Sequence, residues 1–501
     1  MAKFRLLSGG LVCLMASACA PTFVQDRMYF DHLAKAPGGM IGSTNTVAAD
    51  AALASIKKAE RKNEYGTKDQ LLLGMDLGMA THVAARYKES EMIFRKSDRL
   101  AELLFTQSFT SILMSYQLND YSLPYKGLPY ERVMINLINA LNYAATGDWS
   151  GALVEARKIR EKLVAYNRMY PQAAGPPGNY SQFDGRARDL LSGHRISYNP
   201  SQLNHYTDDA FARYLSGVFE EAQVATGAGS YQSAYLSYKK AERTYEKYRL
   251  LYNTPIPAFL GPALLRTAEA AGRTSEYRKW RQVYPNVSYI PASGYEQMGH
   301  ILFVGYNGKI FHLAQNKLAF PLPIAGTISM VSFSVPKPVG GGSGVSGHDI
   351  TVRRVDGPAV YQTSSELGDD LMAIGLTNFK DHLNRIILRE AIRSVLKTVE
   401  QITAQNVAYR QGGILAGLGA MIGGGIFAVA SDQADIRSWR LLPASIDFSM
   451  IDLPPGTYDL SIVTRPDVSY GHGGLTERVT LVAGQYLLIR TVNPPPARPN
   501  G

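Results

Sequence analysis

Nine histidines, two cysteines and several adjacent acidic pairs are the side chains of this 501-residue chain whose types most often serve catalysis or metal binding. The histidines are scattered without a close pair at metal-ligand spacing, and the sequence has no HExxH, GxSxG or GxxxxGK[ST] motif. Adjacent carboxylates such as Asp369 and Asp370 diverge on a helix, so we expect this pair to help a helix start. The sequence therefore predicts no enzyme activity, no cofactor and no metal site.

One cysteine lies in a pattern that predicts export. Lys3 and Arg5 precede an uncharged run, residues 6–18, which closes on small residues at 16–18 immediately before Cys19. A basic start, a short apolar stretch and small residues at the cleavage point are typical of a secretory signal peptide, and the run is too short to span a bilayer. We expect residues 1–18 to be removed.

The same residues resemble the lipobox of bacterial lipoproteins, although Ala16 stands where Leu is more usual. The resemblance implies that Cys19 becomes the first residue of the mature chain and carries acyl chains such as palmitate, so that lipid provides the membrane attachment. Ala20, where Asp would otherwise stand, implies sorting to the outer membrane, facing the periplasm. The alternative is a non-lipidated signal peptide that is cleaved at the same place.

Composition predicts a folded, multidomain protein. The chain is too long for one hydrophobic core, and its hydrophobic fraction is 46% with 19% charged residues. Cys13 leaves with the signal peptide, so we expect no internal disulfide and no cysteine metal site. The formal net charge of +10 falls to 10 − 2 = +8 without Lys3 and Arg5. Such a charge suits either contact with anionic envelope surfaces or a solvated surface, and we expect no nucleic-acid partner.

Residues 48–290 predict a succession of helices. Three segments share aromatic and small residues at offsets 0, +3, +7 and +10, beginning at Tyr87, Trp149 and Tyr231. An aromatic residue after a turn, followed by small residues at helical spacing, is the pattern with which two helices pack as a hairpin. The residues expected to make this packing are Tyr87, Trp149, Ala152, Tyr231, Ala234 and Tyr238.

Residues 141–152 and 229–241 resemble the tetratricopeptide repeat, and 263–280 resembles it more weakly. The anchors are 149 − 87 = 62 and 231 − 149 = 82 residues apart, whereas tandem repeats recur at about 34 residues, so a regular superhelix is not expected. The resemblance implies a concave surface for a partner protein. The alternative is a compact bundle of helices against the C-terminal half.

Beyond residue 295 the pattern changes to β structure. Strands at 301–304 and 309–313 flank Asn307 and Gly308, a signal for a tight hairpin, and further strands are expected at 327–335 and 349–355. A literal GxGxxG lies within 340–347 between two strands, so it predicts a mobile loop and no dinucleotide site. We assign 295–362 to a β-hairpin region.

Residues 363–431 combine a long helix, expected at 365–410, with an apolar segment. A basic stripe at 385–397 predicts either an anion-binding face or the wet side of an amphipathic helix; it consists of Arg385, Arg389, Arg393 and Lys397. Residues 412–431 carry no charge and contain the glycine steps Gly413, Gly417, Gly419 and Gly423. Three alternatives remain open for this apolar segment: a buried hairpin of two short helices, self-association, or insertion into a membrane.

Residues 432–493 predict a small β-sandwich-like module with strands at 445–451, 457–464, 478–481 and 486–492, followed by a flexible tail at 494–501. Residues 434–443, together with 129–136 and 140–143, resemble a family of uncharacterised proteobacterial lipoproteins with helical repeats ahead of a β-rich region. The resemblance implies architecture and an envelope location but no catalytic residue. Asp435, Arg437 and Trp439 are expected to form a clasp between domains.

These patterns predict an α+β multidomain protein: a tether at 19–47, tetratricopeptide-like helices, then a β-rich region with an inserted long helix and a Gly-rich hairpin. We expect a non-enzymatic, lipid-anchored scaffold that binds a protein partner through its helical repeats, with regulation of peptidoglycan synthesis as a narrower hypothesis. The alternative function is that of a structural, self-associating component of an envelope-spanning secretion or motility complex.

Overall fold

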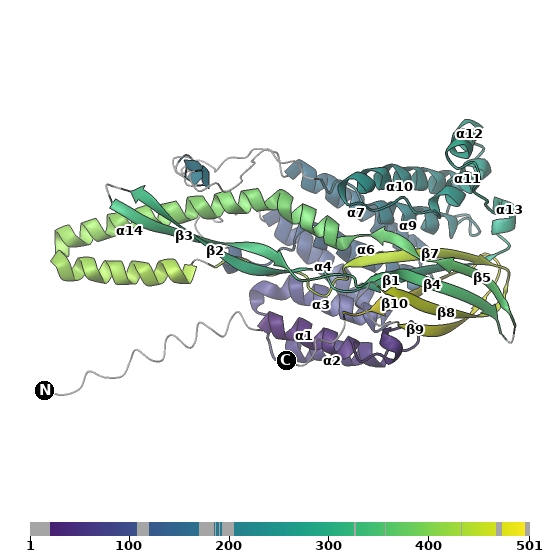
Figure 1. Ribbon diagram of the computed structural model, residues 1–501, viewed down its shortest axis with the longest axis horizontal. Coiled ribbons are helices and arrows are strands. Elements are labelled where there is room, and N and C mark those ends of the chain that lie inside the picture. The colour runs from purple at the N-terminus through teal and green to yellow at the C-terminus, as the bar shows by residue number, and fades with distance from the viewer. Residues whose placement is uncertain are drawn as a thin grey trace.

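The computed structural model describes residues 21–107, 120–169, 205–324, 327–355, 357–431, 433–466 and 473–495, with 185, 187–189, 191 and 192. Helices fill the N-terminal half and sheets the C-terminal half, so the predicted mixed α+β class is confirmed (Figure 1). The signal peptide, Cys19 and most of 171–205 and of the tail lie outside the described residues.

The helices of the N-terminal half pack as consecutive pairs: α1 with α2, α3 with α4, α6 with α7, α9 with α10 and α11 with α12. Their bounds are α1 Pro21–Leu33, α2 Val47–Arg61, α3 Gln70–Val83, α4 Tyr87–Gln107, α6 Pro129–Ala145, α7 Trp149–Met169, α9 Ala210–Glu221, α10 Tyr231–Leu251, α11 Leu260–Ala270, α12 Thr274–Val283 and α13 Ala292–Tyr295. Tyr87, Trp149 and Tyr231 each begin the second helix of a pair, where the sequence predicts them. The predicted tetratricopeptide character of the pairs is not confirmed.

Local chemistry fixes the turn between α6 and α7. Gly147 adopts a φ of +74°, a left-handed conformation that glycine reaches without steric cost. The side chain of Asp148 then accepts a hydrogen bond from the backbone N–H of Gly151 at 2.9 Å, which satisfies one free donor at the start of α7. The chain therefore reverses direction within the short segment between the two helices.

Small residues allow the paired helices to lie close together. A methyl group added to Gly217 of α9 would come within 2.5 Å of the Tyr238 ring on α10, and one added to Gly78 of α3 within 2.6 Å of Phe94 on α4. Ala152 and Ala234 are fully buried in the corresponding contacts of α7 and α10. These close approaches explain the alternation of aromatic and small residues along the helical half.

The strands form two four-stranded sheets and one separate hairpin. The first sheet has the order β10-β1-β7-β6, the second has the order β5-β4-β8-β9, and β2 pairs with β3. Their bounds are β1 Gly299–Asn307, β2 His312–Ile324, β3 Thr327–Val339, β4 Val345–Arg354, β5 Ala359–Ser364, β6 Glu366–Asp369, β7 Ser445–Leu453, β8 Gly456–Pro466, β9 Gly474–Leu481 and β10 Tyr486–Asn493. The two sheets stack face to face as a β-sandwich around a shared apolar core.

The structure corrects two predictions about these strands. β1 and β2 do not pair across Asn307 and Gly308, because β1 lies between β10, in parallel register, and β7, in antiparallel register. Residues 432–493 do not form a module of their own, since β7 and β10 flank β1 while β8 and β9 extend the sheet of β4 and β5. One sandwich therefore combines the two regions that the sequence analysis separates.

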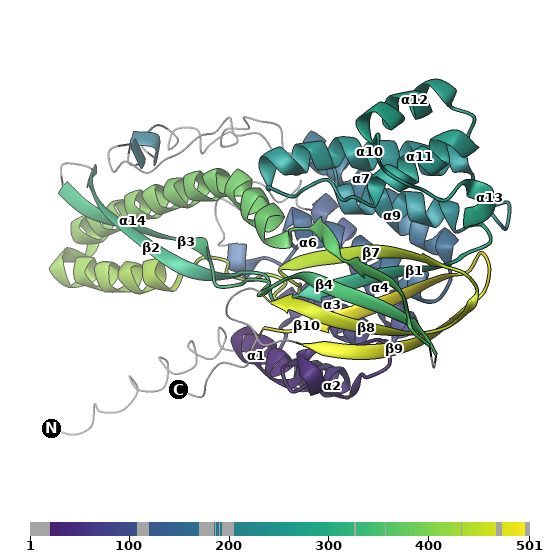
Figure 2. The same ribbon diagram turned by 45° about the vertical axis from the view of Figure 1, so that its right-hand side comes forward.

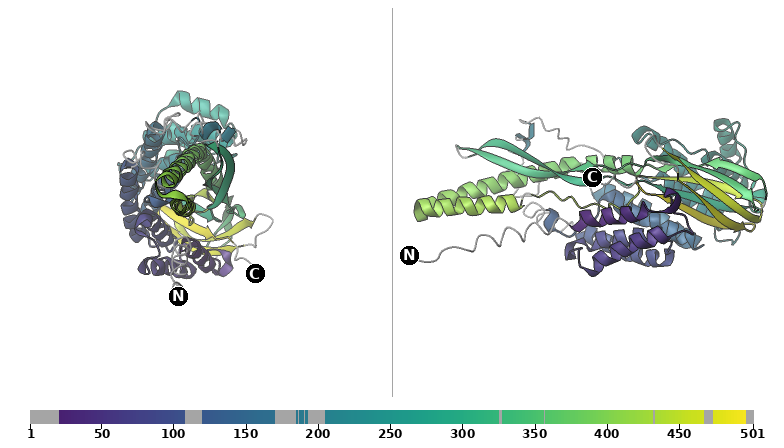
Figure 3. Two further views of the ribbon diagram at one scale, coloured as in Figure 1. Left: turned by 90° about the vertical axis from the view of Figure 1, so that its left-hand side faces the viewer. Right: turned by 60° about the horizontal axis from the view of Figure 1, so that its bottom comes forward.

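Strand β1 is buried on both faces, and this burial joins the two halves of the protein. Ile301 and Phe303 point into the sandwich core, whereas the alternate residues Leu302, Val304 and Tyr306 pack against the helices. Viewed along the long axis, the helices form an arc around the first sheet (Figure 3, left). The inner side of the helical array is thus occupied by the chain's own sheet. This agrees with the alternative of a compact bundle of helices against the C-terminal half.

Helix α14, Leu371–Ser431, and the β2–β3 hairpin extend away from the sandwich as an elongated arm (Figures 1 and 2). Apolar side chains of α14 such as Ile387, Ala391 and Val395 pack against Val331 and Phe333 of β3. The predicted helix at 365–410 begins later because residues 366–369 form β6.

The backbone of 412–431 continues α14, whose last part runs back beside the first (Figure 1). The side chains of this segment, those of Gly413, Gly417, Gly419 and Gly423 among them, lie outside the described part of the structure. None of its three alternatives is therefore tested. As far as the structure describes side chains, no helix is long and apolar enough to cross a membrane.

The predicted tether at 19–47 is wrong, and so is one of the two alternatives for the basic stripe. The 19–47 tether instead contains α1, whose Tyr29 and Leu33 are buried, and Ile41, which forms a β-bridge with Val492. Enough apolar side chains are present here to fold against the body. The basic stripe is not simply a wet face, because Arg393 is buried and pairs with Glu390 on the same helix at 2.5 Å. The side chain of Arg385 lies outside the described residues.

We predict that Phe448→Ala destabilises the helices and the sandwich together. Phe448 of β7 is fully buried, with its ring centroid 5.1 Å from that of Phe211 and 4.7 Å from that of Tyr214, both on α9. Loss of this side chain is expected to lower the free energy of unfolding by about 3–5 kcal/mol in a single urea transition. Val482→Ala, at an exposed position, is the control. Two transitions, with only one of them shifted, would contradict the shared core.

Candidate functional site

The segment that links α14 to β7, residues 433–444, lies against the helical half and contains the predicted clasp. Arg437 donates to Asp69 at 2.9 Å, to Asp435 at 2.7 Å and to the carbonyl oxygen of Leu123 at 3.1 Å. The guanidinium is almost fully buried, and its two carboxylate partners and one carbonyl satisfy charge and hydrogen bonding together. The sequence names Asp435 and Arg437 but does not reveal their helical partner, because Asp69 is 368 residues away.

Trp439 anchors the same segment. Its side chain is fully buried beside Phe94, with ring centroids 5.9 Å apart, and its backbone N–H donates to Glu131 at 2.7 Å. The other carboxylate oxygen of Glu131 accepts from the backbone N–H of Leu128 and from the hydroxyl of Tyr125, so that one side chain both caps α6 and holds the linking segment. Burial raises the pKa of Glu131 to about 7, against the opposing effect of these hydrogen bonds.

Aromatic and polar contacts join the remaining predicted packing residues to the sheet, to a neighbouring helix or to the segment just before β1. Trp149 packs edge-on against Tyr486 of β10 at 5.8 Å, and the hydroxyl of Tyr87 accepts a hydrogen bond from Arg490 at 3.1 Å. Tyr238 donates to Glu221, which also pairs with the buried Arg266. Tyr231 donates to Glu296, beyond the helical pairs. These residues therefore serve packing between helices, or between helices and sheet.

A Ser, a His and an Asp meet inside the sandwich, but their hydrogen bonds do not suit nucleophilic catalysis. His348 Nδ1 and the hydroxyl of Ser365 both contact Asp447, and Nε2 of the histidine faces the amide nitrogen of Asn493 at 2.7 Å. The serine hydroxyl thus donates to the carboxylate and not to the histidine, which lacks a free nitrogen to accept its proton. His348 and Asp447 are also buried, so this network fixes the sheet interior.

A second buried histidine lies between the helices and the sheet. His82 of α3 contacts Asn142 of α6 at 2.7 Å and the hydroxyl of Tyr306 on β1 at 2.9 Å. Burial lowers the pKa of His82 to about 3, so the ring is neutral at physiological pH. A neutral ring that bonds at both nitrogens is a structural group and not a proton carrier.

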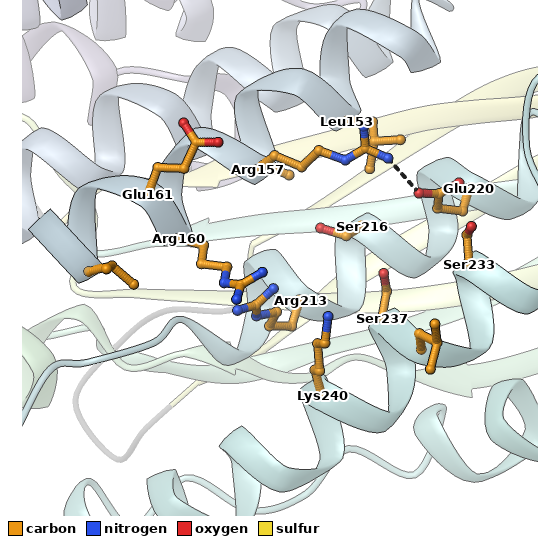
Figure 4. A pocket seen from close by; sticks show the side chains of 13 residues that line it. Leu153, Arg157, Arg160, Glu161, Arg213, Ser216, Glu220, Ser233, Ser237 and Lys240 are labelled. Carbon is orange, nitrogen blue, oxygen red and sulfur yellow. Dashed lines mark hydrogen bonds and ion pairs between the residues drawn. The ribbon is translucent and has the colours of Figure 1, made fainter.

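The outer side of the helical array carries a groove of about 490 Å³ between α7, α9 and α10 (Figure 4). On α9, Arg213, Ser216 and Glu220 line the groove, while Phe211 and Tyr214 of the same helix pack inward against Phe448. The complete lining is Leu153, Ala156, Arg157, Arg160, Glu161, Val164, Arg213, Ser216, Glu220, Ser233, Leu236, Ser237 and Lys240. The groove therefore faces away from the sheet.

The groove holds an excess of positive charge. Arg157 pairs with Glu220 at 3.0 Å, and Arg213 pairs with Asp208 just outside the lining at 3.0 Å. Among the described residues, neither Arg160 nor Lys240 forms an ion pair, although Asp208, which pairs with Arg213, also favours the charged form of Lys240. Burial, reinforced by Arg213 and Arg160, lowers the pKa of Lys240. Figure 4 shows Arg160, Arg213 and Lys240 directed toward one another across the groove, while the carboxylate of Glu161 points away.

Comparison of the chain with protein-family models, curated proteins and solved structures finds no match. Its described residues contain no cluster of His, Cys, Asp and Glu that could hold a metal ion. The sequence alone does not reveal the groove, since its cations come from α7 and from the separate pair α9 and α10. Arg213 and Lys240 are 240 − 213 = 27 residues apart, and only the pairing of α9 with α10 brings them together.

We predict that the difference in free energy of unfolding between Asp76→Asn and the unmodified chain favours the variant more at pH 8 than at pH 5. Burial raises the pKa of Asp76 to about 8, while Tyr65 and Arg440 favour its ionised form and Asp26 and Glu131 oppose it. The folded protein keeps a proton that the unfolded chain loses above its ordinary pKa, so this contribution to stability is lost as pH rises toward 8. Asparagine still accepts the hydrogen bond from Tyr65 but has no charge to bury.

Urea denaturation at the two pH values measures this difference. The advantage of the variant is expected to grow by about 2–4 kcal/mol from pH 5 to pH 8. Glu60→Gln, on the exposed side of α2, controls for the removal of any carboxylate. An advantage that does not change with pH would mean that Asp76 is ionised in the folded protein.

Proposed function

We propose that this protein is a non-enzymatic, lipid-anchored adaptor on the periplasmic face of the outer membrane, and that it binds a protein partner through its helices. The observation that carries the proposal is the filled inner side of the helical array, where Leu302, Val304 and Tyr306 of β1 are buried. A partner then binds the outer side of the array, and the groove of α7, α9 and α10 is the surface best suited to it. This changes the expected concave binding surface but keeps the expected class of function.

We also propose that the pairs α3–α4, α6–α7 and α9–α10 are divergent repeats of the tetratricopeptide kind. Support comes from the shared position of Tyr87, Trp149 and Tyr231 at the start of each second helix, and from the buried Ala152 and Ala234 that follow. The adaptor role and the narrower role in peptidoglycan synthesis rest on analogy between architectures.

The alternative proposal is a self-associating structural component of an envelope complex, and the arm favours it. The β2–β3 hairpin and α14 extend beyond the sandwich, and α14 ends in the uncharged segment 412–431 (Figure 1). An extended element of this kind is suited to contact copies of the same chain or a membrane. A Cys19→Ala protein that is soluble and monomeric without detergent would support the adaptor, whereas large rings or retention in membranes would support the structural component.

We predict that Cys19→Ala abolishes incorporation of a palmitate analogue and releases the protein from the outer membrane. Without the thiol there is no site for the acyl chains, and one or more chains supply the membrane affinity. Labelling of cells with an alkyne fatty acid, followed by membrane fractionation, measures both effects. The control is Cys13→Ala, which removes the other cysteine and is expected to leave labelling intact. Labelling of the Cys19→Ala protein would contradict the anchor.

We predict that a photo-crosslinking amino acid at Ser237, within the groove, captures the same envelope protein as one at Leu236, which also lines it. Both positions lie on α10 and face the proposed partner, so their products share one mass. The same amino acid at the exposed Val482, beyond β9, is the control and is expected to yield no such product. Identical products at all three positions, or none at the two groove positions, would contradict partner binding at this surface.

A further inference from the structure

We propose that the groove of α7, α9 and α10 recognises an acidic segment of the partner protein that also carries apolar side chains. This inference rests on the proposed adaptor function and adds the chemistry of its ligand. The groove, and not the inner side of the array, has both the charge and the open volume that such a segment requires.

Charge gives the first argument. The lining contains four cations against two carboxylates, and Arg157 already uses Glu220. Arg160 and Lys240 are exposed and form no ion pair among the described residues, while Arg213 lies between them with its guanidinium shared with Asp208 (Figure 4). Like charges held close together repel, and a carboxylate bound among them would relieve that repulsion. Arginine also presents a planar set of donors that matches a carboxylate.

The lowered pKa of Lys240 agrees with this arrangement. Partial desolvation of this otherwise exposed side chain is the largest cause, the positive charges of Arg213 and Arg160 add to it, and the carboxylate of Asp208 opposes it. The groove therefore holds an excess of positive charge that Asp208 compensates only in part, and a bound anionic group would neutralise the remainder.

Apolar side chains give the second argument. Val164 of α7 and Leu236 of α10 line the groove and expose 39% and 37% of their surface, and Leu153 and Ala156 form a buried part of its wall. A free inorganic anion would leave these apolar surfaces in contact with water. A peptide with alternating acidic and apolar side chains would cover them and meet the cations at the same time.

The hydroxyl groups of the lining complete a binding surface and not a reactive one. Ser216 donates within α9 to the carbonyl oxygen of Ala212 at 2.7 Å, and Ser233 accepts a hydrogen bond at 3.0 Å from Ser230, the residue that caps the start of α10. Among the described residues that line the groove there is no histidine to serve these serines as a base. The volume of about 490 Å³ lies within the range of about 300–1,000 Å³ that is usual for ligand pockets.

The test uses the purified, full mature protein in mild detergent and a fluorescein-labelled decapeptide of alternating glutamate and leucine, with fluorescence anisotropy as the readout. We expect saturable binding that weakens at high salt, because screening reduces the attraction between charges. The variant Arg160→Gln/Lys240→Gln removes the two unpaired cations and is expected to bind about 5- to 10-fold more weakly.

The matched control is Arg243→Gln/Lys247→Gln, which removes two exposed charges of α10 outside the lining. Its affinity is expected to stay within about twofold of the unmodified protein, since only general attraction at long range is lost. Circular dichroism of both variants establishes that they fold. Equal weakening by the two variants, or no binding of the peptide at all, would overturn the proposal.

Two further probes separate other anions from the acidic peptide. Inorganic phosphate and vesicles with anionic lipid are each tested against the same variants. If Arg160→Gln/Lys240→Gln weakens the binding of phosphate or vesicles but not that of the peptide, the ligand is not an acidic peptide and the proposal is overturned. If the peptide binds at the groove but no partner is crosslinked at Ser237 in envelopes, this inference is supported and the adaptor function is contradicted. Crosslinking without peptide binding overturns this inference alone.

Discussion

The rest of the structure depends on the burial of β1 on both of its faces. A strand has two faces, and in β1 one of them completes the sandwich while the other completes the helical core. Neither half can bury its apolar surface alone. Without the sheet, the inward aromatic side chains of α7 and α9 would be exposed to water. Without the helices, Leu302 and Tyr306 would be exposed to water. The hydrophobic effect therefore favours two cores that share β1, across what the sequence divides into domains.

Polar contacts determine how the two halves sit on each other. Arg437, Glu131 and His82 bridge helices and β-rich region from buried positions, and each has partners on both sides. An apolar interface tolerates sliding, whereas a buried hydrogen-bonded group loses several partners if the register changes. The same burial raises the pKa of Glu131 and lowers that of His82, so both shifts are consequences of assembly. They do not by themselves indicate a catalytic site.

Local patterns made the helices and most strands predictable, because periodicity and turn residues act over a few positions. Tyr87, Trp149 and Tyr231 begin helices as expected, and the strands after residue 444 lie where alternation predicts them. Strand pairing was not predictable: Asn307 and Gly308 favour a hairpin locally, but β1 gains more by inserting between β10 and β7. The groove was missed for a related reason, since Arg160, Arg213 and Lys240 converge only through helix packing. Asp435, Arg437 and Trp439 were recognisable as unusual, but their partners were not.

Native-state hydrogen exchange measures most directly whether the helices and the sandwich are one cooperative unit. The account predicts that the slowest backbone amides of β1 and those of α6 and α9 exchange with the same free energy of opening, and that these values fall together as urea is added. If the helices open at a markedly lower free energy while β1 stays protected from exchange, the helices unfold separately from the sheet. The inner side of the helical array would then be accessible to a partner, which would contradict the central claim.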